Sequence, residues 1–131
     1  MEQLDLSYCL CVILMVLHFV FGLAEMFFWN WLGPSLARNR DSNGLDSKNL
    51  ERAIGWSWFM AFNQGVYNLF LAGGLLMCLG AGMTVDVGLA KFFAVCIALA
   101  GLAGAYSGVK TVLLVQTIPA VLLIGALMFG L

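Results

Sequence analysis

The sequence consists of long apolar stretches separated by short islands of charge. Apart from Glu25, the charged residues lie within 2–5, 38–52 and 86–91 and at Lys110. Each stretch between these islands has about 20 residues or more, the length of helix that crosses roughly 30 Å of hydrocarbon. Backbone polar groups in hydrocarbon must pair within their own segment, so each stretch is expected to be helical.

The composition excludes an ordinary soluble domain. Hydrophobic residues make up 63% of the chain and charged residues 10%, against about 25% charged residues in typical globular proteins. A soluble fold of 131 residues could not hide so much apolar surface, because a small fold leaves much of its surface in water. The net charge of −1 provides no basic surface for nucleic acid. The lipid bilayer is therefore the predicted partner.

The predicted fold is all-α, an integral membrane up-down four-helix bundle forming a single transmembrane domain over residues 1–131. Its helices are expected at about 6–29, 50–79, 89–107 and 111–131, with a loop at 30–49. The Gly33-Pro34 and Asn43-Gly44 pairs indicate turns within that loop. Short connections after the second and third spans make neighbouring helices antiparallel. The first span lacks a basic leader and a small-residue cleavage site, so it is interpreted as a retained helix.

The distribution of basic residues predicts the orientation. Five of the six lie on the side of the first and third connections: Arg38, Arg40, Lys48, Arg52 and Lys110. The other side carries Lys91. Because cytoplasmic loops carry an excess of Lys and Arg, the loop at 30–49 is predicted to be cytoplasmic and both termini periplasmic. Four tryptophans flank the same loop, as expected at a membrane interface: Trp29, Trp31, Trp56 and Trp58.

Small residues within the spans indicate helix packing. The third span carries a stripe at helical spacing, comprising Ala94, Ala98, Gly101, Ala105 and Gly108, along which a neighbouring backbone can approach closely. Gly73, Gly74 and Gly80 can act similarly in the second span. The four cysteines form no Cys-x-x-Cys pair and have no histidine nearby, which favours a packing role: Cys9, Cys11, Cys78 and Cys96.

Polar side chains within the spans mark the candidate site, because they are costly in hydrocarbon. His18 and Glu25 are two helical turns apart and share one face of the first span. The remaining candidates lie in the other spans and connections: Asn63, Gln64, Tyr67, Asn68, Tyr106, Lys110 and Gln116. At 1.5 Å per residue, these groups converge on the midplane and the cytoplasmic half. The pattern predicts either a polar cavity that binds a ligand or an interhelical hydrogen-bond network.

His18 and Glu25 each allow two interpretations. Glu25 is either a buried carboxylate that binds a cation or relays a proton, or an interfacial carboxylate paired with Lys110. His18 is either part of that site or a neutral core histidine bonded to a neighbour. One histidine cannot build a multi-histidine metal site, so no metal ligand is assigned, and the cofactor stays unknown.

Three strings of residues resemble a known family: His18-x6-Glu25-Met26-Phe27, Asn63-Gln64-Gly65-x-Tyr67-Asn68, and Ala105-x4-Lys110 followed by Gln116-x-x-Pro119. They are similar to the pattern of small bacterial membrane proteins grouped as domain of unknown function 1304. The resemblance spans nearly the whole chain and implies a four-helix membrane fold with no established activity. The family often has an acidic residue just before the histidine, where this chain has Leu17.

Three functions compete. The first is binding or transport of a small molecule or ion in the polar cavity, with Glu25 as the coupling group, in a homodimer or larger complex. The second is an accessory or redox-linked subunit that binds a quinone. The third is an intramembrane enzyme on a lipid, with His18 and Glu25 as acid and base. The chain shows no nucleophile elbow, phosphate loop or dinucleotide fingerprint, so no catalytic residue is assigned and a non-enzymatic role is favoured.

Overall fold

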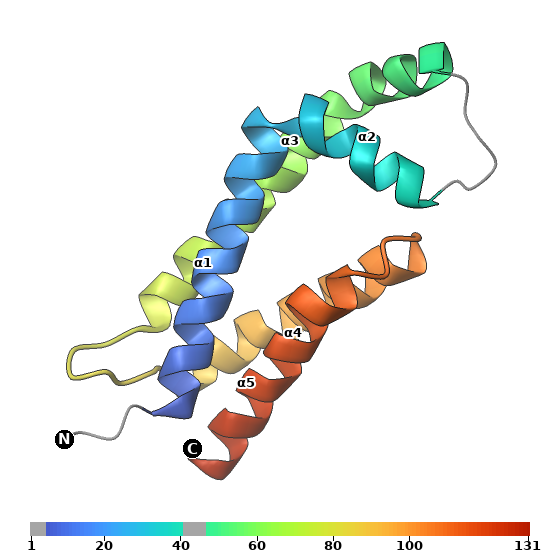
Figure 1. The fold of residues 1–131 in the computed structure, drawn as a ribbon. Coiled ribbons are helices and arrows are strands. Elements are labelled where there is room, and N and C mark those ends of the chain that lie inside the picture. The colour runs from blue at the N-terminus through green and yellow to red at the C-terminus, as the bar shows by residue number, and fades with distance from the viewer. Residues whose placement is uncertain (1–4, 41–46) are drawn as a thin grey trace.

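The computed structural model describes residues 5–40 and 47–131, and it is all-α within these ranges, which confirms the predicted class. The elements in chain order are α1 (Leu6–Phe27), α2 (Trp29–Arg40), α3 (Ser47–Cys78), α4 (Val87–Tyr106), the π-helical turn η1 (Leu113–Thr117) and α5 (Ile118–Phe129). Helix α1 packs mainly against α3, and α4 packs mainly against η1 and α5. Figure 1 shows these as two helix pairs that meet near the chain termini.

The first connection differs from the predicted loop at 30–49. Residues 29–40 form α2, and α3 begins at Ser47. The Nε1–H group of Trp29 donates to Ser57 Oγ at 3.1 Å, so α2 is tied to α3. Gly33 is buried against Trp29 and Ile54, and Pro34 lies inside the helix. Packing against α3 therefore outweighs the turn preference of the Gly33-Pro34 pair. The predicted turn at Asn43-Gly44 lies outside the described residues.

The connection between α3 and α4 reverses the chain tightly. The backbone N–H of Asp86 donates to the Cys78 carbonyl at 2.8 Å. The Asp86 carboxylate accepts from Leu89 N at 2.9 Å and caps the first turn of α4. Gly82 has φ 75°, a conformation that glycine adopts without steric cost. These contacts make α3 and α4 antiparallel.

The fourth predicted span is a helix with a π turn at its start. The turn occupies Leu113–Thr117, and Pro119 follows at the beginning of α5. Proline lacks an N–H group, and its ring clashes with the carbonyl of the residue four positions earlier. The π turn just before Pro119 is wider than an α-helical turn, so it accommodates both the missing hydrogen bond and the ring of Pro119. The neighbouring α4 approaches closely there, because a Cβ at Gly101 would collide with Thr117 Oγ1.

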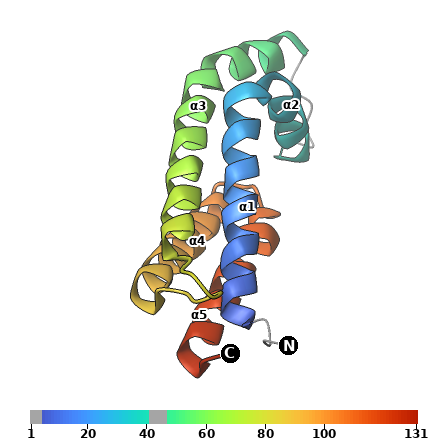
Figure 2. The ribbon, with the colours of Figure 1, turned by 90° about the vertical axis from the view of Figure 1, so that its left-hand side faces the viewer.

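Both ends of the described chain lie at the same end of the molecule. The backbone N–H of Ser7 donates to the Leu131 carbonyl at 2.9 Å, which joins the start of α1 to the residue that lies two positions after the end of α5. Gly130 ends α5 with φ 68°, the left-handed conformation common after a helix. Figures 1 and 2 show the start of α1 and the end of α5 at the same end of the molecule.

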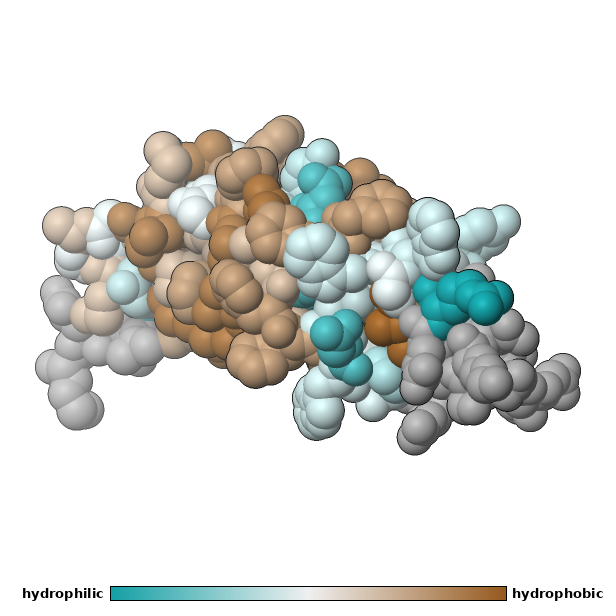
Figure 3. All heavy atoms as spheres, turned by 90° about the horizontal axis from the view of Figure 1, so that it is seen from above, coloured by the Kyte–Doolittle hydropathy of each residue, from teal (hydrophilic) through white to brown (hydrophobic). Residues whose placement is uncertain are grey.

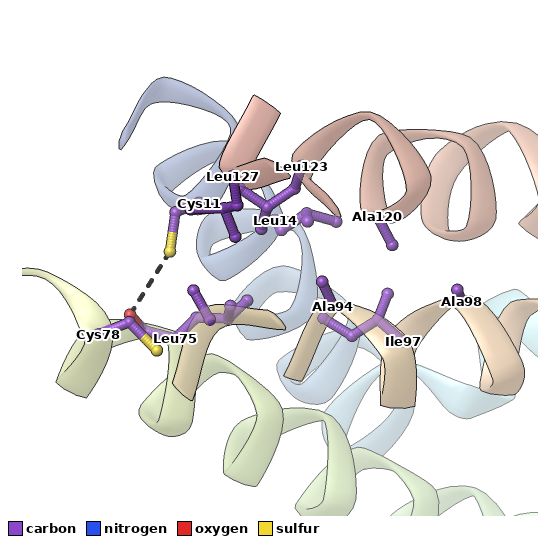
Figure 4. Close-up of a cluster of buried hydrophobic side chains, with 11 residues drawn as sticks. Cys11, Leu14, Leu75, Cys78, Ala94, Ile97, Ala98, Ala120, Leu123 and Leu127 are labelled. Carbon is purple, nitrogen blue, oxygen red and sulfur yellow. Dashed lines mark hydrogen bonds between the residues drawn. The ribbon is translucent and has the colours of Figure 1, made fainter. Parts of the chain in front are cut away.

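The shared core of α1, α3, α4 and α5 lies near these termini. Figure 4 shows its side chains converging from all four helices. The buried members are Cys11, Leu14, Leu75, Cys78, Ala90, Ala94, Ile97, Ala98, Ala120, Leu123 and Leu127. Towards the end that carries α2, the α4–α5 pair diverges from the α1–α3 pair (Figure 1). The described helices thus number five, and four of them share a core at one end.

The outer surface is strongly apolar. Large hydrophobic side chains are exposed on every long helix, among them Phe19, Phe70, Leu99 and Leu122. Figure 3 shows hydrophobic side chains covering much of one face and hydrophilic ones gathering towards the end with α2. Among the described helices, α1 and α4 are long and apolar enough to cross a membrane.

Candidate functional site

Two glycines bring α1 and α3 into close contact. A Cβ at Gly22 would lie 2.8 Å from the Leu69 side chain and 2.9 Å from the Gly65 carbonyl. A Cβ at Gly65 would lie 2.7 Å from the Gly22 carbonyl and 2.5 Å from Met26 Cγ. Both glycines are buried. The helices therefore touch backbone to backbone, and this contact sets which residues of the antiparallel pair lie level with one another.

The contact places Asn68 beside Glu25. Gly22 contacts α3 between Gly65 and Leu69. Asn68 therefore lies about level with Gly22, one helical turn nearer than Glu25 to the end of the molecule that carries the chain termini. The Asn68 Nδ2–H group donates to Glu25 Oε2 at 2.7 Å. Asn68 is only 2% exposed, while Glu25 is half-buried. Because the carboxylate can only accept, the donor must be the amide nitrogen, and Asn68 Oδ1 is turned away from Glu25.

His18 lies on the same face of α1 as Glu25, two helical turns before it in the chain, and is 1% exposed. Its Nδ1 is 2.9 Å from the carbonyl oxygen of Leu14. A carbonyl only accepts, so Nδ1 carries the proton and, in the neutral ring, Nε2 is an acceptor. Nε2 is buried and has no hydrogen-bond partner among the described residues. Phe21 packs against the ring edge-on, with centroids 5.9 Å apart.

We call His18, Asn68 and Glu25 the polar row. It runs along the seam between α1 and α3. Leaving an acceptor buried without a donor costs about 1–3 kcal/mol, and native proteins rarely leave such groups unpaired. The row therefore contains one satisfied pair, Glu25 with Asn68, and one group whose partner the described chain does not supply.

The other predicted site residues do not join the row. Asn63 and Gln64 are exposed on α3. Tyr67 is 52% exposed and packs edge-on against Phe70. The last three lie on α4, on the connection after it and on η1: Tyr106, 95% exposed at the end of α4; Lys110, exposed in the connection; and Gln116, half-buried in η1. Among the described side chains Glu25 bonds to Asn68 rather than to Lys110.

One feature escaped the sequence interpretation. An apolar groove of about 430 Å³ lies between α1 and α3, lined by Met15, Val16, Phe19, Leu69, Ala72, Gly73 and Leu76. In the sequence, the groove is indicated by the small residues Ala72 and Gly73 on α3, which lie opposite the larger residues Met15 and Phe19 at helical spacing on α1. In a chain this apolar, that signal does not stand out from ordinary packing residues.

The cysteines and acidic groups build no metal centre in the described ranges. No three His, Cys, Asp or Glu side chains converge there. All four cysteines are free thiols. Cys11 and Cys78 lie in the core, where Cys11 Sγ is 3.7 Å from the Leu75 carbonyl and Cys78 Sγ is 3.1 Å from the Gly74 carbonyl. These contacts fit a packing role.

Comparison with known proteins gives one result. No curated protein and no solved structure matches the chain. The family model described as "Protein of unknown function (DUF1304)" matches residues 12–128. This range includes the polar row, all of α3 and α4, and most of α1 and α5. The chain therefore belongs to the DUF1304 family.

Proposed function

We propose that this chain is a multi-pass protein of the bacterial inner membrane that binds or transports a small molecule or ion at the polar row. In this proposal α1, α3, α4 and the continuous η1–α5 segment are the four passes of a membrane bundle. The termini face the periplasm, and α2 lies at the cytoplasmic interface.

The apolar surface supports the membrane location. In the best 18-residue windows of α1 and α4, 28% of residues are buried. A core helix of a soluble protein would be mostly buried, so the low fraction favours lipid as the surrounding medium. Helix α3 has 32 residues and would extend about 48 Å, long enough to cross the bilayer and continue beyond it.

The tryptophans and basic residues support the orientation. Trp31 and Trp56 are 75% and 74% exposed, and both lie near the end of the molecule that carries α2. Tryptophan is enriched at membrane interfaces, and cytoplasmic connections are enriched in Lys and Arg. Arg38 and Arg40 at the end of α2, together with Arg52 near the start of α3, therefore support a cytoplasmic location for that end.

The observation that carries the binding function is the composition of the polar row. A carboxylate held by a buried amide stands on the same helix face as a buried imidazole nitrogen that has no partner among the described residues. Ionisable groups are rare inside membrane helices and mark ligand or proton pathways. The pair of Glu25 and Asn68 satisfies only part of this arrangement, so a ligand that completes it explains why these groups are there.

The test is the recovery of a bound molecule. The full chain is purified in nanodiscs with its native lipids, and native mass spectrometry measures bound small molecules or ions. Glu25→Gln keeps the shape and accepts from Asn68 but lacks the charge, and it should release the bound species. Asp86→Asn is the matched control, because it removes a carboxylate in the α3–α4 connection while keeping a capping side chain. Equal occupancy in both variants would refute the proposal.

An accessory or redox-linked subunit that binds a quinone is a second candidate, favoured by the apolar groove between α1 and α3. Isoprenoid tails are apolar chains, and the groove offers an entirely apolar lining from Met15 to Leu76. Solvent extraction of the same preparation, with absorbance spectra and chromatography, detects quinones directly. Gly73→Leu would fill the groove from α3 and should remove the quinone while leaving the polar row unchanged.

A further inference from the structure

The face of α3 that packs against α4 changes from apolar to polar along the helix. Near the termini α4 covers this face, because a Cβ at Gly74 would collide with the Phe93 ring of α4. Tyr67 lies seven residues before Gly74, so the two residues point in directions that differ by about 20°. Gln64 lies seven residues before Leu71, which is partly buried and packs against the shared core. The face therefore continues through Tyr67 and Gln64 towards the end with α2.

The polar part of this face is uncovered. Tyr67 is 52% exposed and Gln64 is also exposed, because the α4–α5 pair diverges from the α1–α3 pair towards that end (Figure 1). Counted from Cys78 at the end of α3, the two residues lie about 17 and 21 Å along the helix. In the membrane placement proposed above, both lie within the hydrocarbon, where amide and hydroxyl groups without partners are costly.

Helix α4 carries a matching face. On the side of α4 that contacts α3 through Phe93, Ala100 and Gly104 follow seven and eleven residues later, at helical spacing. Because α3 and α4 are antiparallel, Ala100 is about level with Tyr67, and Gly104 is about level with Gln64. Ala100 is exposed and Gly104 is half-buried. Both residues are small enough for the backbone of another helix to approach closely.

The end of α4 offers a hydrogen-bond partner for Gln64. Side chains lean towards the N-terminus of their own helix, so Gln64 leans towards the end of the molecule that carries α2. In the same register, Ser107 after α4 lies about one turn further towards that end than Gln64. Its exposed hydroxyl donates to the Gly104 carbonyl at 2.8 Å, and the hydroxyl oxygen can still accept from an amide N–H.

We propose that the α4–α5 pair closes over this face of α3, and that the structure is the open form of a two-state bundle. In the closed form Ala100 packs on Tyr67, and the Gln64 amide bonds to the end of α4. The helix pairs turn about the core that all four helices share near the termini, in the manner of a hinged closure. The proposal rests on the membrane placement proposed above, and it requires no ligand at the polar row.

Continuity with an existing contact favours closure within one chain. The contact of Gly74 with Phe93 already joins this face of α3 to α4, and closure extends the same contact in the same register towards the end with α2. A second copy of the chain would instead have to insert a helix between the two diverging pairs. The test below distinguishes these two ways of covering the face.

The experiment measures disulfide cross-linking of the full chain in nanodiscs. Tyr67→Cys is combined with Ala100→Cys, copper-phenanthroline in air oxidises the thiols, and peptide mass spectrometry identifies the joined cysteines. The matched pair is Val66→Cys with Ala100→Cys, because Val66 has nearly the same depth but points about 100° away from Tyr67. A disulfide needs Cα atoms about 4.4–6.8 Å apart, so the Tyr67 pair should cross-link within one chain about tenfold faster than the Val66 pair.

The outcomes decide between closure and its alternatives. Circular dichroism checks that each variant is folded, and Gln64→Cys with Gly104→Cys tests the same closure one turn further along if the first pair does not fold. Equal rates for the closure pair and the Val66 pair, or no bond within one chain, would overturn the proposal. A bond between two copies in Tyr67→Cys alone would also overturn it, because a second copy would then cover the face. Each of these results leaves the binding function to its own test, the recovery of a bound molecule.

Discussion

The close contact at Gly22 provides a test of how the polar row is positioned. In Gly22→Ala, the added methyl group would lie 2.9 Å from the Gly65 carbonyl oxygen and 2.8 Å from the Leu69 side chain. Leu69 can rotate aside, but the carbonyl belongs to the backbone of α3 and cannot move alone. The two helices must separate by several tenths of an ångström, and the Asn68–Glu25 bond must lengthen with them.

Gly73→Ala is the matched variant in the same helix pair. Gly73 is exposed on α3, and a Cβ there would have no heavy atom within 4 Å beyond its own helix and neighbours. Both substitutions gain about 1 kcal/mol of helix propensity, so this contribution cancels in the comparison. Overpacking a tight site costs about 1–3 kcal/mol. Gly22→Ala should therefore be less stable than Gly73→Ala by about 1–3 kcal/mol.

The assay is reversible unfolding in mixed detergent micelles, followed by circular dichroism. Gly73→Ala should be at least as stable as the parent chain, and Gly22→Ala should fall below Gly73→Ala by the stated free energy. Equal stability of the two variants would refute the argument, because it would mean that α1 and α3 do not touch at Gly22. Binding of the native ligand should also weaken in Gly22→Ala alone.

Three further predictions use the same unfolding assay. His18→Phe removes an unpartnered buried acceptor and a hydrogen bond of about 1 kcal/mol, so the ligand-free chain should keep or gain up to about 1–2 kcal/mol; a loss above about 2 kcal/mol would contradict the description of Nε2 as unpaired. Asp86→Ala should lose about 0.5–2 kcal/mol as the α4 cap is removed, while Asp86→Asn should lose little. Trp29→Phe breaks the bond to Ser57 and should cost about 0.5–1.5 kcal/mol, with faster proteolysis at α2 as the second measurement.

The helical segments were predictable because hydropathy and charge alone mark them. The expected span at 89–107 corresponds to α4 at Val87–Tyr106, and the expected start at 50 lies within α3. Helix α2 was not predictable, because Gly33 and Pro34 signal a turn and the stabilising contact with α3 is tertiary. Charge patterns locate the ends of membrane helices, but they say little about a short helix packed at an interface.

The divergence of the two helix pairs could not be predicted from the sequence, for a related reason. Side chains that face lipid and side chains that face another helix are both apolar, so hydropathy does not distinguish them. Small residues give more information about where helices pack closely, but not all of them lie at the close contacts that were expected. Gly101 does lie at a close crossing with Thr117, and Gly74 lies against the Phe93 ring, but Gly73 faces open space. A glycine permits close approach without requiring it.

The sequence was likewise unable to show which polar residue of α3 would reach Glu25. A helix turns 100° per residue, so the run from Asn63 to Asn68 covers most of the circumference of α3. Asn68 faces Glu25, while Asn63, Gln64 and Tyr67 are exposed. Membership in one run of sequence therefore did not identify which amide would reach the carboxylate, because the rotation of α3 about its own axis is set by packing.

That rotation is set by Gly65, which gives the string Asn63-Gln64-Gly65-x-Tyr67-Asn68 a physical meaning. Gly65 contacts Gly22, and three residues later Asn68 faces the same neighbour. Since Glu25 is likewise three residues after Gly22 and the helices run in opposite directions, the two side chains lean towards each other across the seam. The same geometry leans Asn68 away from His18. One pair of glycines thus accounts both for the bond at Glu25 and for the acceptor left without a partner on His18.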